Sequence, residues 1–186
     1  MEIPEKAALL VIDVQLAFDD PRPGPRNNPA MEENLRALLE AWRATKRPLI
    51  HVRHMSTEPN SLFRPGLPTN EFKPEVVPRA GERVIEKSVN SAFIGTPLER
   101  ELREQGIDTL FLVGIQTNHC VSTTARMAGN LGFHTHVIGD ACATRDRKGP
   151  DGKIWPAQTL HDVALADLHG EFATVVDTRQ VLAATR

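Results

Sequence analysis

Short, continuous apolar runs alternate with segments of helical periodicity along almost the whole chain. Runs such as LLVI and LFLVG are apolar on successive residues, which suits strands that are buried on both faces of a parallel sheet. The strand candidates are 7–14, 48–52, 83–85, 109–114, 135–139 and 172–176. The helix candidates are 31–45, 97–105, 120–131, 157–168 and a short tail from 178. This order predicts a three-layer α/β domain (α-β-α) with a six-stranded, mainly parallel sheet.

The chain has the length of one domain. With 186 residues, of which 40% are hydrophobic, it can bury roughly 70% of its unfolded surface in a single core. Two proline-rich stretches, 19–29 and 56–80, interrupt the alternation and are predicted to be loops. A loop of about 25 residues in a compact domain is often functional. We therefore predict a single domain over residues 1–186.

Charge and hydropathy argue against several classes of partner. The formal net charge of -2, from 22 basic and 24 acidic residues, gives no attraction toward a phosphate backbone, so no nucleic acid is expected as a partner. No apolar stretch approaches the roughly 18 to 20 residues that span a bilayer. The opening sequence MEIPEKAALL lacks the basic n-region of a signal peptide. We therefore expect a cytoplasmic protein that binds no membrane.

One segment places a cysteine where a strand passes into a helix. Cys120 lies in the segment GIQTNHCV, which follows the apolar strand candidate 109–114. Unpaired N–H groups and the dipole at a helix N-terminus favour a thiolate, so we expect a lowered pKa for this thiol. The same N–H groups can hold an oxyanion. A buried structural cysteine at a strand–helix junction explains the segment equally well.

Two charged residues end other strand candidates. Asp13 follows LLVI, and Lys87 ends RVIEK. Taken singly, Asp13 is better explained as a turn-capping residue and Lys87 as a solvated side chain. Together with Cys120, however, they lie at the carboxyl ends of three strands, where doubly wound folds bind ligands. A nucleophile, a base and a cation are the groups that acyl transfer requires.

These segments carry a resemblance to a known family. ALLVIDVQLAF surrounds Asp13, VIEKSVNSAF surrounds Lys87, and VGIQTNHCVSTTARMAGNLGF surrounds Cys120, with VIGDACAT further along the chain. In order and spacing they resemble the isochorismatase-like cysteine hydrolases, which include nicotinamidases, N-carbamoylsarcosine amidases, ureidoacrylate hydrolases and streptothricin hydrolases. The resemblance implies the isochorismatase-like (Rossmann-like) fold.

The resemblance also implies a catalytic triad and a reaction. Asp13 would accept the thiol proton, Cys120 would attack a carbonyl carbon, and Lys87 would stabilise the ionised pair. A cis peptide between Ile115 and Gln116 is implied, with the backbone amides of Gln116 and Cys120 forming the oxyanion hole. The expected activity is hydrolysis of a C–N amide-type bond of a small-molecule substrate through a thioester.

Other family features are absent or differ. Nicotinamidases carry a metal site after the second strand, built from an Asp and histidines. Here His51 and His54 are three apart, which sends them to opposite faces of a strand, and no Asp accompanies them. We expect no metal and no cofactor. Phe18 and Phe93 are candidates for the substrate pocket, although core packing is an equal alternative for each.

His119 and Cys142 are the remaining candidates for a chemical role. His119 is adjacent to Cys120, and side chains at a helix start diverge by about 100°, so His119 is not expected to act as its base. Cys142 is predicted to be a small buried hydrophobic residue.

Two rival functions remain open. The same triad would serve the hydrolysis of another bond, such as that of an ester, lactam or carbamoyl group. The other rival is a binding protein that has kept the fold and lost catalysis. Separately, the family resemblance implies a homo-oligomer, either a dimer or a tetramer.

Overall fold

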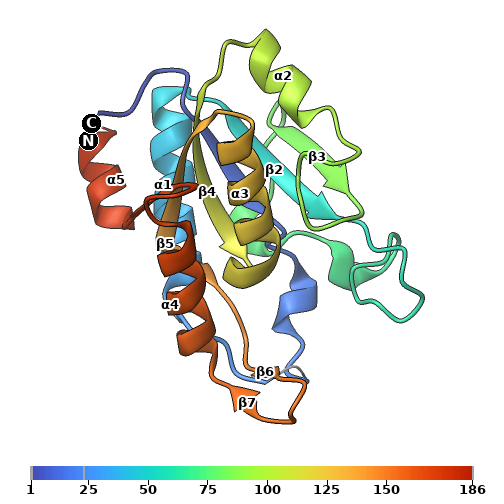
Figure 1. Ribbon diagram of the computed structural model, residues 1–186. Coiled ribbons are helices and arrows are strands. Elements are labelled where there is room, and N and C mark those ends of the chain that lie inside the picture. Colours follow the sequence, from blue (N-terminus) through green and yellow to red (C-terminus); the bar gives the residue numbers. More distant parts are fainter. Residues whose placement is uncertain (1, 23, 186) are drawn as a thin grey trace.

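The computed structural model describes residues 2–22 and 24–185 and has one main sheet of six strands (Figure 1). The strand order is β3-β2-β1-β4-β5-β8, and each neighbouring pair is parallel. The strands are β1 (Ala8–Ile12), β2 (Leu49–His54), β3 (Arg83–Lys87), β4 (Thr109–Ile115), β5 (His134–Ala143) and β8 (Thr174–Val176). The predicted three-layer α/β fold with a six-stranded parallel sheet is confirmed.

Helices cover both faces of the sheet because the central strands are apolar on both sides. In β1, Leu9 and Val11 pack toward α1 (Met31–Thr45) and α5 (Thr178–Ala184). The alternate residues of the same strand, Leu10 and Ile12, pack toward the helices on the opposite face of the sheet. That layer consists of α2 (Leu98–Glu104), α3 (Ser122–Asn130) and α4 (Ala157–Leu168). The two hydrophobic clusters therefore lie on opposite sides of one sheet.

Several boundaries differ from the sequence-based expectation. The predicted helix 120–131 begins as α3 only at Ser122, because a π-helical turn, η4 (Thr117–Val121), precedes it. A small antiparallel pair, β6 (Arg147–Lys148) and β7 (Ile154–Trp155), was not predicted. One short 3-10 turn runs into the start of the proline-rich stretch 19–29, and two more lie within the stretch 56–80. These are η1 (Leu16–Asp19), η2 (Pro68–Asn70) and η3 (Pro74–Val76).

No helix within the described part of the chain is long and apolar enough to cross a membrane.

Candidate active site

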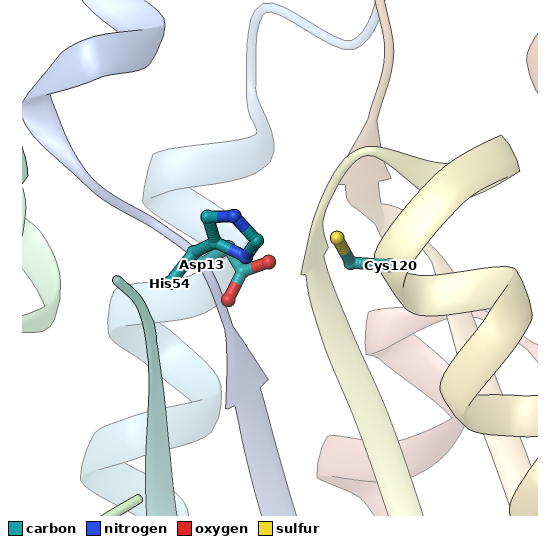
Figure 2. Close-up of side chains that lie close together, drawn as sticks. All are labelled: Asp13, His54 and Cys120. Carbon is teal, nitrogen blue, oxygen red and sulfur yellow. The ribbon is translucent and has the colours of Figure 1, made fainter. Parts of the chain in front are cut away.

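The fold brings Asp13, Lys87 and Cys120 together at the carboxyl edge of the sheet. Asp13 directly follows β1, Lys87 ends β3, and Cys120 lies in η4 after β4. The Lys87 Nζ is 2.6 Å from Asp13 Oδ2, and the two side chains are 0% and 3% exposed. The Cys120 sulfur lies within 4.8 Å of an Asp13 carboxylate oxygen. Figure 2 shows Cys120 facing Asp13 from the turn between β4 and α3.

The backbone at Asp13 turns its side chain into this site. Asp13 has a φ of 54°, in the left-handed region, which costs on the order of 1–3 kcal/mol for a residue other than glycine and is concentrated at functional sites. Its N–H donates to the Val52 carbonyl at 2.9 Å, and its carbonyl accepts from the Gln15 N–H at 2.9 Å. The carboxylate is consequently held at the end of β1 with one oxygen, Oδ2, on Lys87. The other oxygen, Oδ1, is buried and has no hydrogen-bond partner among the described residues.

Lys87 donates all three of its N–H groups. Besides Asp13 Oδ2, it donates to His54 Nδ1 at 3.1 Å and to the Val89 carbonyl at 3.1 Å. An ammonium group has no acceptor, so His54 must accept at Nδ1 and is neutral. Burial, together with the charge of Lys87, lowers the pKa of His54 below its usual value. The buried cation is therefore fully coordinated.

Sequence reasoning did not assign His54 to the site. A signal was available, because His54 of β2 is the register partner of Lys87 in β3. As predicted, His51 lies on the opposite face, where its ring contacts Glu82 with Nε2 and Oε2 3.0 Å apart. Only the pairing of β2 with β3 shows which of the two histidines lies at the site.

The Cys120 thiol is not pre-ionised in the free protein. Burial, reinforced by the negative charge of Asp13, raises the pKa of Cys120 to about 12. The expectation that the helix N-terminus would lower this pKa is therefore wrong for the free protein. The reason is that the desolvation cost and the nearby carboxylate outweigh the dipole of a short turn. Asn90 adds one polar contact, donating from Nδ2 to the sulfur at 3.5 Å.

The turn that carries Cys120 has an unusual backbone. The peptide between Ile115 and Gln116 is cis. Just before it, Gly114 has a φ of 132°, and a Cβ built there would lie 2.0 Å from the Ile12 carbonyl oxygen. Only glycine allows this approach of β4 to β1. The Gln116 carbonyl accepts the N–H of His119 at 3.0 Å, which anchors the first residues of η4.

A cavity of about 170 Å³ opens beside these residues. It is lined by Asp13, Phe18, His54, Phe63, Asn90, Gln116, His119 and Cys120. Phe18 meets Phe63 edge to face, with ring centroids 5.0 Å apart. We refer to this cavity as the active-site pocket. A larger cavity of about 860 Å³ lies near Lys6 and Arg47, ahead of β1 and β2, at the opposite end of the strands from Cys120.

Phe93 does not line the active-site pocket. Its side chain is buried in the core and stacks on Phe133, with ring centroids 5.8 Å apart. The placement of Phe93 at the substrate is corrected to a packing role, because the chain after Lys87 turns this ring toward the α2 side of the sheet. Phe18 does line the pocket, and Phe63 of the loop 56–80 joins it.

Two buried amide side chains fix the wall formed by His54 and Phe63. Gln15 donates to the carbonyls of Asn70 at 2.7 Å and His54 at 3.1 Å, and its Oε1 accepts the His54 N–H at 2.8 Å. Asn70 donates in turn to the Phe63 carbonyl at 2.7 Å. The long loop is therefore tied to the end of β2, which holds the pocket in shape.

Asp13, His54 and Cys120 also offer one metal-ligand atom each within 4.8 Å of one another. This set does not suit a metal well, because the ammonium of Lys87 already occupies Asp13 Oδ2 and His54 Nδ1. A cation beside it would meet like-charge repulsion in a buried setting. The donor set is better explained by acid–base chemistry than by a metal centre.

A scan against family models matches residues 7–180 to the isochorismatase domain. The isochorismatase family protein YrdC of Bacillus subtilis (strain 168) is 46% identical over 178 residues, which cover 96% of this chain and 95% of YrdC. A crystal structure from the isochorismatase family of Chromobacterium violaceum ATCC 12472 superposes with a TM-score of 0.96 at 48% identity. It covers 100% of this chain and 96% of that one.

More distant relatives carry names that state a reaction. Nicotinamidase 3 of Arabidopsis thaliana is 28% identical, covering 92% of this chain and 84% of its own. Streptothricin hydrolase of Streptomyces noursei is 33% identical, covering 75% and 55%. Maleamate amidohydrolase of Pseudomonas putida is 35% identical, covering 62% and 48%. The first and last of these names denote action on amides.

Proposed function

The chain belongs to the isochorismatase family of hydrolases, and from this premise we propose that it is a cysteine amidohydrolase acting on a small molecule. In this proposal Cys120 is the nucleophile, Asp13 the proton acceptor and donor, and Lys87 the cation that pairs with Asp13. The related nicotinamidase and maleamate amidohydrolase support hydrolysis of a C–N bond.

The proposal rests mainly on the surroundings of the two carboxylate oxygens of Asp13. Lys87 occupies one carboxylate oxygen at 2.6 Å, while the other oxygen is buried and unpartnered within the described residues. A buried acceptor without a donor is costly in a folded protein. It is explained if this oxygen receives the proton of the Cys120 thiol, which is otherwise held protonated by its raised pKa.

The reaction follows from these positions. The thiol proton moves to Asp13 as the sulfur attacks the amide carbonyl carbon, and the resulting oxyanion takes hydrogen bonds from the Gln116 and Cys120 backbone amides. When the intermediate collapses, the C–N bond breaks and Asp13 protonates the departing nitrogen. A thioester on Cys120 remains. Asp13 then accepts a proton from water, which attacks the thioester to release the acid, and the proton returns to the sulfur.

The same chemistry extends to other acyl compounds. An ester, a lactam or a carbamoyl group would pass through a similar acyl-enzyme. The related streptothricin hydrolase is named for its substrate and not for a bond, so such acyl compounds belong among the substrates to be tried. A binding protein without catalysis would have no need for an unpartnered carboxylate oxygen beside a cysteine.

Trapping the acyl-enzyme tests the proposal. The protein is incubated with small amides, including nicotinamide and maleamate, in the presence of hydroxylamine, which converts a thioester into a hydroxamate. We expect hydroxamate and free ammonia from at least one amide. In a parallel reaction without hydroxylamine, stopped with acid, we expect a mass increase located on the Cys120 peptide. Cys120→Ala should give neither, whereas Cys142→Ala should give both. Hydroxamate formation that survives in Cys120→Ala would disprove the assignment of the nucleophile.

A further inference from the structure

His161 is a buried histidine that the proposed mechanism does not use. It lies in α4, which packs against η4 and α3, and its side chain is not among those that line the active-site pocket (Figure 1). His161 Nδ1 is 2.8 Å from Thr117 Oγ1, and the two residues are 4% and 0% exposed. Thr117 is the first residue of η4, the turn that carries Cys120. The ring therefore contacts the turn of the nucleophile without lining the pocket.

Thr117 lies where its backbone can set the orientation of the turn. It directly follows Gln116, whose backbone amide is one of the two proposed oxyanion donors. The Gln116 carbonyl belongs to the same peptide group as the Thr117 nitrogen. This carbonyl accepts the N–H groups of His119 at 3.0 Å and of Val121 at 3.3 Å, the two residues on either side of Cys120. A rotation at Thr117 would therefore move the peptide groups around the nucleophile.

The other side of the His161 ring is fixed by the loop 19–29. Asn28 Nδ2 lies 3.4 Å from His161 Nε2 and donates to the carbonyls of Cys142 at 2.6 Å and Gly139 at 3.2 Å. Carbonyls only accept, so the atom beside the ring is the amide nitrogen, which is a donor. Nε2 must then be the acceptor, and the ring proton is on Nδ1, directed at Thr117. Burial lowers the pKa of His161, so the ring is neutral at pH 7.

A second contact holds the same turn from the end of β5. Thr144 Oγ1 donates to Oδ1 of Asn118, the second residue of η4, at 2.6 Å. The Thr144 N–H donates in turn to Asn27 Oδ1 at 2.7 Å. The first two residues of η4 are thus held by side chains from α4 and from the end of β5, and the loop 19–29 supports both contacts.

We propose that His161 is a positioning residue. Through its hydrogen bond to Thr117, it holds η4 in the orientation in which the backbone amides of Gln116 and Cys120 face the developing oxyanion. This inference rests on the proposed amidohydrolase function and adds a residue to its machinery. His161 is neutral and contacts the turn through Thr117, so its removal should affect the step that forms the oxyanion and not the ionisation of the thiol.

Two reactions of the same thiol separate these effects. With 4-nitrophenyl acetate the sulfur bonds to the acetyl carbon, an oxyanion forms, and 4-nitrophenolate leaves. With iodoacetamide the sulfur bonds to the methylene carbon and iodide leaves, without an oxyanion. The first is measured as kcat/KM for phenolate release after subtraction of the rate in Cys120→Ala. The second is measured at the same pH by mass spectrometry of the Cys120 peptide.

His161→Leu removes the hydrogen bond without changing any charge. We expect acylation to fall by about 10- to 100-fold, because a small displacement of oxyanion donors has an effect of this size. Alkylation should stay within about threefold, since it depends on the pKa and exposure of the thiol. His161→Asn places an amide at the position of Nδ1 and should recover most of the acylation rate. His136→Leu, which removes a ring stacked on Phe111 in the core, is the control and should alter neither reaction.

Thr117→Val removes the same hydrogen bond from the other partner and keeps the shape of the side chain, so it decides the question even if His161→Leu does not fold. Its acylation rate should fall as in His161→Leu. The double variant should lose no more than either single variant, because all three lack one shared contact. Losses that multiply would overturn the proposal. Equal falls in acylation and alkylation, or an unchanged acylation rate, would also overturn it.

Failure of this inference can be told apart from failure of the proposed function. Phenolate release that survives in Cys120→Ala would show that the nucleophile is assigned wrongly, and the role of His161 would be refuted with it. If release depends on Cys120 but the ratio of acylation to alkylation is insensitive to His161 and Thr117, only the positioning role is refuted, and the amidohydrolase proposal stands.

Discussion

The turn after β4 and the end of β5 each carry a cysteine, and the two regions are neighbours in the sheet. Gly114, near the end of β4, is the register partner of Cys142 in β5. Burial raises the pKa of Cys142 to about 12, as burial and Asp13 do for Cys120. The two sulfur atoms differ in the groups that surround them. Cys142 is fully buried in the apolar core, 4.0 Å from the Leu112 carbonyl, whereas Cys120 faces a carboxylate, an amide and an open pocket.

The comparison shows that thiol pKa in the free protein does not identify the nucleophile. Both thiols are protonated at pH 7, so neither is a stored thiolate. Cys120 differs from Cys142 in lying beside a carboxylate, which under the proposed mechanism removes its proton while a substrate is bound. In that proposal the reactive cysteine is defined by Asp13 and Lys87, which lie at the ends of β1 and β3, and not by its own segment.

Removing each cysteine should separate the two regions most strongly. Cys120→Ala is expected to lower kcat/KM by about 10⁴-fold or more, because the covalent route is lost. Cys142→Ala should leave kcat/KM within about twofold and lower the free energy of unfolding by about 1–2 kcal/mol through a small cavity. Initial rates and urea unfolding of both variants check this. Comparable activity losses would abolish the distinction.

Lys87→Met tests whether the Cys120 region depends on a buried ion pair. Leaving the Asp13 carboxylate buried without its partner should lower the free energy of unfolding by about 3–5 kcal/mol. Adding Asp13→Asn should recover much of this loss, because the double variant buries no charge. The exposed pair Arg83–Glu101, also at 2.6 Å, is the control.

Breaking that exposed pair with Arg83→Met should cost less than about 1 kcal/mol. Urea unfolding of Lys87→Met, Lys87→Met/Asp13→Asn and Arg83→Met, each compared with the unaltered protein, measures the differences. If Lys87→Met lowers the free energy of unfolding no more than Arg83→Met does, the buried Lys87–Asp13 pair does not stabilise the region around Cys120.

Gly114→Ala perturbs the boundary between the two regions. The added Cβ would overlap the Ile12 carbonyl, and the backbone φ of 132° is unfavourable for alanine, so we expect a loss of about 2–3 kcal/mol. Gly132→Ala, at a φ of 83° with no atom within 4 Å of the added Cβ, should cost about 1–2 kcal/mol. Thermal and urea unfolding compare the two. Equal losses would mean that the close approach of β4 to β1 is not constraining.

Much of the architecture could be predicted because its causes are local. The apolar run LLVI and the change to Asp13 mark a strand and its carboxyl end without knowledge of any other segment. The same holds for RVIEK and Lys87. Parallel strands meet at one edge, so these ends were expected to gather. The register of the strands then sets the distances, such as 2.6 Å between Lys87 and Asp13, which no spacing rule provides.

The features that could not be predicted depend on contacts between segments. The pKa of Cys120 was expected to be lowered, because its own segment supplies a helix start, whereas burial and the carboxylate of Asp13 raise it. His54 entered the site through pairing of β2 with β3. Phe93 was a candidate for either the pocket or the core, because it lies near Lys87 in sequence, and it packs on Phe133 in the core.

The central claim is that Asp13 removes the proton of a neutral Cys120 thiol. It is tested most directly by the pH dependence of iodoacetamide alkylation at Cys120, followed by mass spectrometry in a Cys142→Ala background with and without Asp13→Asn. With Asp13 present, we expect alkylation to remain slow until pH rises well above the usual thiol pKa of about 8.5. Asp13→Asn removes the negative charge that raises the pKa of Cys120 and leaves the Lys87 cation, so alkylation should begin at lower pH.

Amide hydrolysis should fall in the same variant by about 10²- to 10⁴-fold, because the base is lost. A thiol that becomes easier to ionise while the enzyme becomes less active is the result that this account predicts. Fast alkylation below pH 7 with Asp13 intact, or an Asp13→Asn profile shifted to higher pH, would contradict it.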